Sequence, residues 1–284
     1  MSDYKYPTIG LSLMCLNDFY NKELALKVLN IINSYGKDFI PDKFDNYQPL
    51  KKKYNLENLD EVLEGWLNEE GNSVNKEYMM GSLLMKKSRS SKASYMISWE
   101  KTQEPNFHYF SLSVNIDYLK NQKKIQKFME LSKELIFAFN PVNGWIINKM
   151  SNHNSGPINL RLRHPELQWL NIFGKPYIEL FGREKLLNTP CYKAYELSED
   201  IIIIQLTESV FEDIPDEVRL RVKEYLGKDA FVELGKSSHN YKEGIAPNFD
   251  FTDVLFDKTK PVELEEFEIV EELNMDDFQI TISD

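Results

Sequence analysis

The chain has 284 residues, 42% of them hydrophobic, and its 45 Asp and Glu against 34 Lys and Arg give a net charge of -11. This length suits one large domain or two ordinary ones. The charge balance argues against nucleic-acid binding, which needs a basic surface, and no apolar run approaches the roughly 18 to 20 residues of a membrane span. The N-terminus lacks the pattern of a secretory signal, and Cys15 and Cys191 are the only cysteines. We therefore expect a cytoplasmic protein in a reducing compartment.

The first half of the chain predicts strands and helices in the order of a ferredoxin-like plan with insertions. Helical stripes of apolar residues mark three helices, and short β-rich runs mark five strands. Asp18 is the expected N-cap of the first helix, and residues 41–53 are expected to be a loop. In chain order, the predicted elements are strand 8–16, helix 18–35, helix 56–68, strands 82–86, 94–99 and 107–116, helix 121–139 and strand 144–150. Helices packed on a mainly antiparallel sheet would bury these stripes, which makes the fold class α+β.

The second half predicts helices around a hairpin. Residues 166–187 are expected to be helical in two pieces, broken near Gly174 and Gly182. Residues 191–197 and 200–206 read as a β-hairpin, and 215–226 as a helix closed by Gly227. The predicted organisation is an α+β sheet subdomain (1–150), a helix-hairpin-helix half packed on it (151–240) and an acidic C-terminal segment (241–284).

The excess negative charge is concentrated at the C-terminal end. Residues 242–284 hold 13 Asp and Glu against 3 Lys, a net charge of -10, so the remainder has a net charge of only -1. Between Val262 and Ile282, however, ten apolar side chains interrupt the acids, which is too many for a fully solvated tail. We expect this segment to dock its apolar positions on the body or on a partner and to turn its carboxylates outward.

No catalytic or metal-binding signature is present. Glycine-rich phosphate loops and the GxSxG motif are absent, and the histidines lack the close ligand spacing of zinc sites. Glu212, Asp213, Asp216 and Glu217 could pass for paired carboxylates, but their place at a helix start accounts for them. We expect no metal, no cofactor and no enzymatic activity.

The stretch that starts at Leu167 reads LQWLNIFGKPYIELFGREKLLNTPCYKAYELSEDIIIIQL and is followed by Thr207-Glu208. This stretch resembles immunity proteins of bacterial contact-delivered toxin systems, in particular the type VI immunity class. The resemblance rests on four motifs: the Trp-Leu-Asn opening, the helix end Phe-Gly-Arg-Glu, the strand Pro-Cys-Tyr and the ending Gln-Leu-Thr-Glu. The similarity extends over roughly residues 8 to 230, and its motifs are structural. It implies a cytoplasmic protein that binds one cognate toxin and blocks it without catalysis.

Two alternatives stay open: an adaptor or scaffold for another basic partner, and an enzyme with an unrecognised carboxylate site. For the favoured immunity function, we expect a toxin with a basic binding surface, and neither nucleic acid nor membrane as partner. The expected partner-binding residues are the acids of the C-terminal segment: Glu263, Glu265, Glu266, Glu268, Glu271, Glu272, Asp276 and Asp277.

Overall fold

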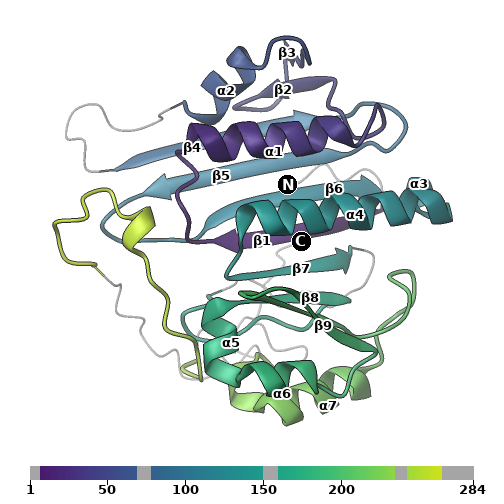
Figure 1. Ribbon diagram of the computed structural model, residues 1–284, viewed down its shortest axis with the longest axis vertical. Coiled ribbons are helices and arrows are strands. Elements are labelled where there is room, and N and C mark those ends of the chain that lie inside the picture. The colour runs from purple at the N-terminus through teal and green to yellow at the C-terminus, as the bar shows by residue number, and fades with distance from the viewer. Residues whose placement is uncertain (1–6, 69–77, 150–158, 234–241, 264–284) are drawn as a thin grey trace, which may run out of the picture.

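The protein, seen in a computed structural model, is described for residues 7–68, 78–149, 159–233 and 242–263. In these ranges, ten strands form one antiparallel sheet in the order β3-β2-β4-β5-β6-β1-β7-β8-β10-β9 (Figure 1). The strands are β1 (Thr8–Cys15), β2 (Lys43–Asp45), β3 (Lys52–Lys53), β4 (Met79–Lys86), β5 (Ser94–Lys101), β6 (His108–Asn115), β7 (Asn143–Asn148), β8 (Leu170–Gly174), β9 (Lys193–Ser198) and β10 (Ile201–Gln205).

The α-helices are α1 (Lys22–Ser34), α2 (Asp60–Trp66), α3 (Ile116–Leu119), α4 (Gln122–Phe139), α5 (Lys175–Phe181), α6 (Arg183–Leu187) and α7 (Asp216–Leu226). Within the described residues, the short 3-10 helices η1 (Lys228–Ala230) and η3 (Thr252–Val254) follow them. The α+β class is confirmed. The neighbours β5-β6-β1-β7, with α1 and α4 in the connections, reproduce the predicted ferredoxin-like order, and β2, β3, α2 and β4 are the insertions.

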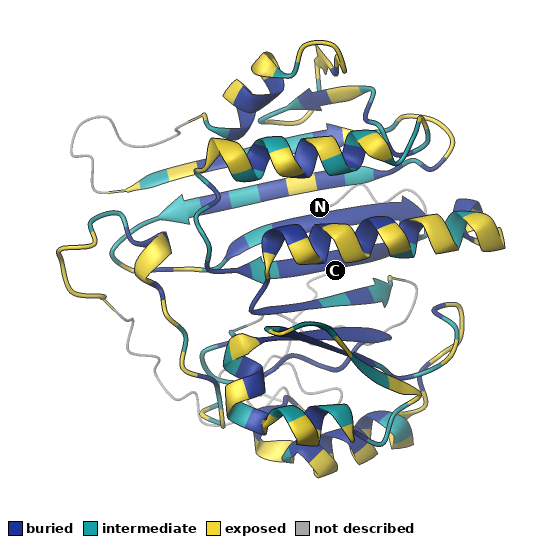
Figure 2. Cartoon of the chain, in the orientation of Figure 1, coloured by how far each residue is buried: buried dark blue, intermediate teal, exposed yellow. Residues whose placement is uncertain are grey.

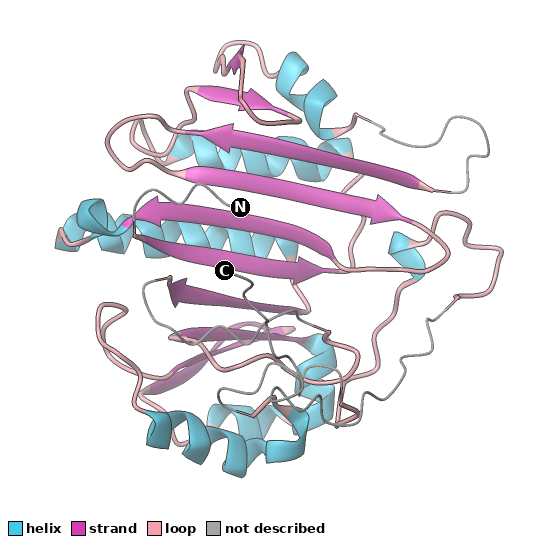
Figure 3. Cartoon of the chain, turned by 180° about the vertical axis from the view of Figure 1, so that it is seen from behind, coloured by secondary structure: helices cyan, strands magenta, loops and turns pink. Residues whose placement is uncertain are grey.

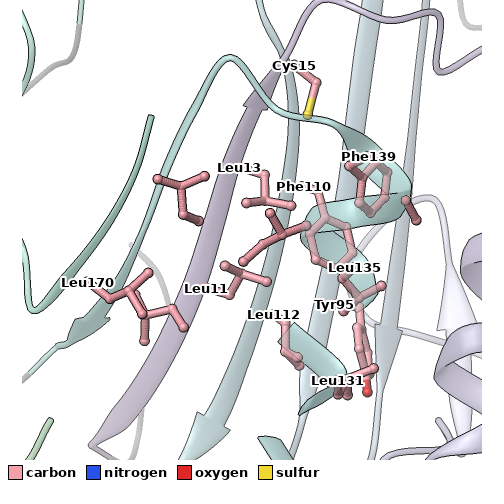
Figure 4. Packing of buried hydrophobic residues seen from close by; sticks show 14 of the residues in the cluster. Leu11, Leu13, Cys15, Tyr95, Phe110, Leu112, Leu131, Leu135, Phe139 and Leu170 are labelled. Carbon is pink, nitrogen blue, oxygen red and sulfur yellow. The ribbon is translucent and has the colours of Figure 1, made fainter. Parts of the chain in front are cut away.

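The main core lies between the sheet and the helix pair α1 and α4, which cover one face of β4 to β7 (Figure 1). The central aromatic is Phe139, whose ring centroid lies 4.6 Å from that of Phe110 and 5.0 Å from that of Phe19. Figure 4 shows Phe139 and Leu135 of α4 directed toward Leu13 and Phe110 of the sheet. Hydrocarbon packing therefore holds α4 in place.

Helix α4 follows its sequence signals closely. The predicted N-terminal residue Asn121 is the N-cap, and its side chain accepts hydrogen bonds from the amides of Lys123 and Lys124. At the other end, Asn140 adopts φ +43° and closes the helix in the left-handed conformation before Pro141.

The N-cap prediction for α1 is wrong. Asn21 caps the helix by accepting from the amides of Glu23 and Leu24. Asp18 instead accepts from Tyr20 N and forms an ion pair with Lys101 Nζ at 2.6 Å. The Asp18 carboxylate therefore pairs with Lys101, which is distant in sequence, and does not cap the helix.

Residues 41–53, predicted to be a loop, contain β2 and β3. These strands of three and two residues extend the sheet at one edge, where Lys43, Lys52 and Lys53 are exposed. Short, charged edge strands discourage pairing with other chains, and they are too brief to leave a periodic sequence signal.

The helix predicted from residue 166 is also wrong in its first part, because residues 170–174 form strand β8. This strand is buried on both faces and pairs with β7 on one side and with β10 on the other. A continuous apolar run fits a doubly buried strand as well as it fits a buried helix. The helical part begins at Lys175, and the hairpin β9–β10 and helix α7 lie where the sequence places them.

Candidate functional site

Helix α7 and the loop before it present an acidic exposed surface. Pro215 is the N-cap residue, Asp216 and Glu217 lie in the first turn, and Gly227 ends the helix with φ +118°. From Glu208 to Tyr225 six acidic residues are exposed, and Arg221 is the one exposed base. The "α7 surface" is the set of exposed side chains Phe211, Glu212, Asp213, Asp216, Glu217, Leu220, Arg221, Glu224 and Tyr225.

Three apolar side chains interrupt these acids: Leu220 is 55% exposed, Phe211 39% and Tyr225 38%. Leu220 lies between Glu217 and Glu224 at a spacing of three and four residues, and all three side chains are exposed. Exposed and buried positions alternate around this helix (Figure 2). One exposed aromatic elsewhere, Phe137, lies under a cation, with Lys27 Nζ 5.6 Å from its ring centroid. Within the described residues, no cation lies over Phe211 or Tyr225. Apolar anchors within a charged rim are the composition of a protein-binding surface.

The opposite face of α7 is fixed by two buried cations. Arg219 Nε donates to Leu167 O at 3.0 Å, and its Nη1 donates to Ile214 O at 2.7 Å. Lys223 Nζ donates to the Glu166 carboxylate at 2.6 Å and to Val232 O at 2.7 Å. These directional bonds fix the rotation of the helix about its axis. Because both cations point inward, the outward face keeps its negative charge.

We call the contacts of Arg219 and Lys223 beneath α7 the clamp. Burial changes the pKa of both cations. It lowers the pKa of the Lys223 ammonium, and the adjacent Glu166 carboxylate opposes that shift. Burial likewise lowers the pKa of Arg219, against Glu166 and Asp216, which raise it. The Glu166 side chain is 3% exposed, and its Oε1 accepts from Leu167 N at 2.9 Å. This carboxylate is thus engaged in holding the helix in place.

Two buried histidines are structural. His164 is packed among Phe173, Tyr177 and Phe231, and burial lowers its pKa to about 4. Its Nδ1 lies 2.7 Å from Pro165 O, so the neutral ring donates there. Burial also lowers the pKa of His108, whose Nε2 lies 2.8 Å from Glu100 O. Among the described residues, no group of three or more His, Cys, Asp or Glu is arranged to hold a metal ion.

The C-terminal acids were the predicted partner-binding residues, and only Glu263 lies within the described chain. Its side chain is exposed, and its amide donates to Gln103 O at 2.8 Å. The remaining predicted residues, Glu265, Glu266, Glu268, Glu271, Glu272, Asp276 and Asp277, lie outside the described residues.

The strap, which we define as residues 242–263, runs along one side of the body (Figure 1) and contacts it at several points. Arg163 binds its start, donating to the backbone oxygens of Lys242 at 3.1 Å and Glu243 at 2.7 Å. Further on, Phe251 and Val254 are buried in a small cluster with Leu16 and Val142. The described part of the strap therefore ends beside Gln103.

The acids of the α7 surface were visible in the sequence but were assigned to helix capping alone. The signal that could have distinguished them is the position of Leu220 and Tyr225 on the polar side of the helix. The inward orientation of Arg219 and Lys223 depends on Leu167, Ile214 and Val232, which sequence patterns do not bring together.

No known family model and no curated protein matches this sequence. Among solved structures, a Pseudomonas aeruginosa T6SS (type VI secretion system) protein has a similar fold, with a TM-score of 0.55 and 12% sequence identity. The similarity covers 78% of this chain and 72% of that protein. At this identity the likeness concerns the fold. None of the described helices has the length and apolar character needed to cross a membrane.

Proposed function

We propose that this chain is an immunity protein that binds a cognate toxin of a type VI secretion system and blocks it without catalysis. The observation that carries the proposal is the α7 surface, on which Leu220 and Tyr225 of the helix and Phe211 of the preceding loop are exposed among acids. Its partner would carry a basic surface with apolar pockets, because opposite charge speeds encounter and buried anchors supply affinity. The fold shared with the Pseudomonas T6SS protein supports the choice of toxin class.

The absence of catalysis is part of the same proposal. The buried carboxylate Glu166 is engaged by Lys223, and the acids of the α7 surface are exposed. A surface that only binds needs shape and charge complementarity, and these residues supply both. The C-terminal acids from Glu263 onward would add to the negative field that attracts the toxin.

The test is direct binding to the toxin encoded beside this gene, together with protection of cells that express the toxin. The informative variant is Glu217→Lys/Glu224→Lys, which reverses two exposed charges on either side of Leu220. We expect association with the toxin to slow by about tenfold or more at low salt, and the effect to shrink as salt rises.

The matched control is Glu57→Lys/Glu61→Lys, which makes the same charge change on exposed residues at the α2 end of the molecule, opposite α7 (Figure 1). It should leave the toxin complex almost unchanged. If the wild-type chain neither binds the neighbouring toxin nor protects cells from it, the proposed function is wrong. An adaptor for another basic partner would then be the next hypothesis to pursue.

A further inference from the structure

The sheet has one face that no described helix covers along β4, β5, β6 and β1. Helices α1 and α4 lie on one side of these strands (Figure 1), and the view from behind shows the strands in front of both helices (Figure 3). Since side chains alternate along a strand, every second residue of these strands points to the uncovered side, which we call the open face.

The open face has a defined composition across five strands. The pairing register aligns Trp145, Ser12, Ser111, Met96 and Leu84 in one row. Large apolar side chains therefore flank a central strip of serines. The serines are almost inaccessible, with Ser12 5% and Ser111 8% exposed, whereas Met96 at the side of the row is 38% exposed. Neighbouring side chains cover part of this strip, since the Tyr109 hydroxyl lies 3.1 Å from Ser12 Oγ and Lys149 Nζ lies 2.9 Å from Ser113 Oγ, but no described helix lies over it.

The described chain ends at one end of this face. Gln103 follows β5 by two residues, and its side chain accepts from Asp257 N at 2.8 Å and donates to Pro261 O at 3.3 Å. The Gln103 backbone oxygen accepts from Glu263 N at 2.8 Å. Residues 264–284 therefore start beside the end of β5. At about 3.3 Å per extended residue they can reach roughly 70 Å, more than twice the length of an eight-residue strand.

The composition of residues 264–284 complements the open face. They contain nine apolar residues of the types Leu, Ile, Val, Phe and Met, and eight acids with no Lys or Arg. The opposite end of the sheet carries basic residues: Lys86 ends β4, Arg89 lies in the turn after it, and Lys149 follows β7 and donates to Ser113 Oγ at 2.9 Å. A segment that crosses from Gln103 would bring its carboxylates to these cations.

We propose that residues 264–284 bind intramolecularly to the open face, with their apolar side chains on the row from Trp145 to Leu84 and their carboxylates toward solvent and toward Lys86 and Lys149. The alternation Phe278-Gln-Ile280-Thr-Ile282 suits a segment with one face on a sheet and one in water. The open face is then an internal docking site and lies apart from the α7 surface.

The experiment measures alkylation of a cysteine placed under the segment, in the full chain without toxin. Ser111→Cys is a close steric replacement on the open face, in a Cys191→Ser background, since Cys15 is buried. The rate is compared with that of a chain ending at Glu263 and with that of the full-length variant Phe278→Asp/Ile280→Asp. Ser34→Cys, exposed at the end of α1, is the control site.

We expect Ser111→Cys to react about tenfold faster in both the shortened and the Asp-substituted chains, while Ser34→Cys reacts at one rate throughout, because a covered thiol reacts only when its cover opens. Added peptide 264–284 should restore the protection. Equal rates for Ser111→Cys with and without the segment would overturn the proposal. Protection that disappears on dilution would also overturn it, in favour of a second copy of the chain. Toxin is absent from the assay, so its outcome is independent of the proposed function.

Discussion

Helices α4 and α7 are held to the same protein by different physics. Helix α4 buries Phe128, Leu135 and Phe139 in an apolar core. Helix α7 buries Val222 and Leu226 in the same core, and in addition its Arg219 and Lys223 donate hydrogen bonds to backbone carbonyls and to Glu166. Apolar packing is non-directional, but hydrogen bonds fix an orientation. The comparison suggests that α4 supplies stability, while α7 is oriented to present a surface.

The largest effect should come from the core under α4. Phe139→Ala removes a ring that contacts Phe19, Phe110 and Trp66, and we expect it to lower the free energy of unfolding by about 3–5 kcal/mol. Denaturant unfolding measures this. The exposed neighbour Phe137→Ala is the control and should change stability by no more than about 0.5 kcal/mol. Similar losses for the two variants would contradict the assignment of the core.

Substitutions in the clamp under α7 should lower the free energy of unfolding by nearly as much. Lys223→Met keeps much of the volume but leaves the Glu166 carboxylate buried and unpaired, so we expect a loss of about 3–5 kcal/mol in unfolding free energy. The double variant Glu166→Leu/Lys223→Met removes both charges and should recover most of that loss. If the double variant is no more stable than the single one, the pair is not what fixes the helix.

Acid should lower the free energy of unfolding through protonation of His164. The folded pKa of about 4 lies below the ordinary value of 6.5, so the unfolded state binds more protons between these values. The contribution of His164 to stability should therefore fall as pH decreases from about 6.5 to about 4, by roughly 3 kcal/mol in total, and be constant above that window. Unfolding measured against pH should show a smaller slope for His164→Phe. An unchanged slope would exclude His164 as its source.

The smallest effect concerns a helix end. Asn121→Ala removes the side chain that caps α4, and we expect a loss of about 1 kcal/mol in unfolding free energy. Helix α7 begins after Pro215 without a side-chain cap, so Pro215→Ala should lower the free energy of unfolding by less than Asn121→Ala does. Thermal unfolding of the two variants compares the two helix starts. The reverse ranking would show that Pro215 supports α7 more than its contacts suggest.

The sequence predicts much of the sheet and its helices because their signals are local. The helix predicted over residues 121–139 agrees with α4, which spans Gln122–Phe139. The errors arise where partners distant in sequence decide. Asp18 forms an ion pair with Lys101 and does not cap α1. Residues 170–174 form a strand because they pair with β7 and β10.

For the α7 surface, the sequence could predict the negative charge but not which side chains are exposed. The acids before and within α7 are plain in the sequence, but their net negative surface depends on Arg219 and Lys223 turning inward. The helical period places these two cations on one side of the helix without showing that this side is buried, since cations on a helix are ordinarily exposed. The exposed positions of Leu220 and Tyr225 likewise follow from packing and not from composition.

The most direct test of the central claim, that α7 presents the toxin-binding surface, is the affinity of Leu220→Ala for the toxin encoded beside this gene, measured by calorimetry. Leu220 is 55% exposed, so its truncation should leave the free energy of unfolding within about 0.5 kcal/mol of the wild-type value. The account predicts that the complex weakens by about 2 kcal/mol, roughly 30-fold in Kd. An unchanged Kd, with the wild-type chain binding tightly, would place the toxin on another surface.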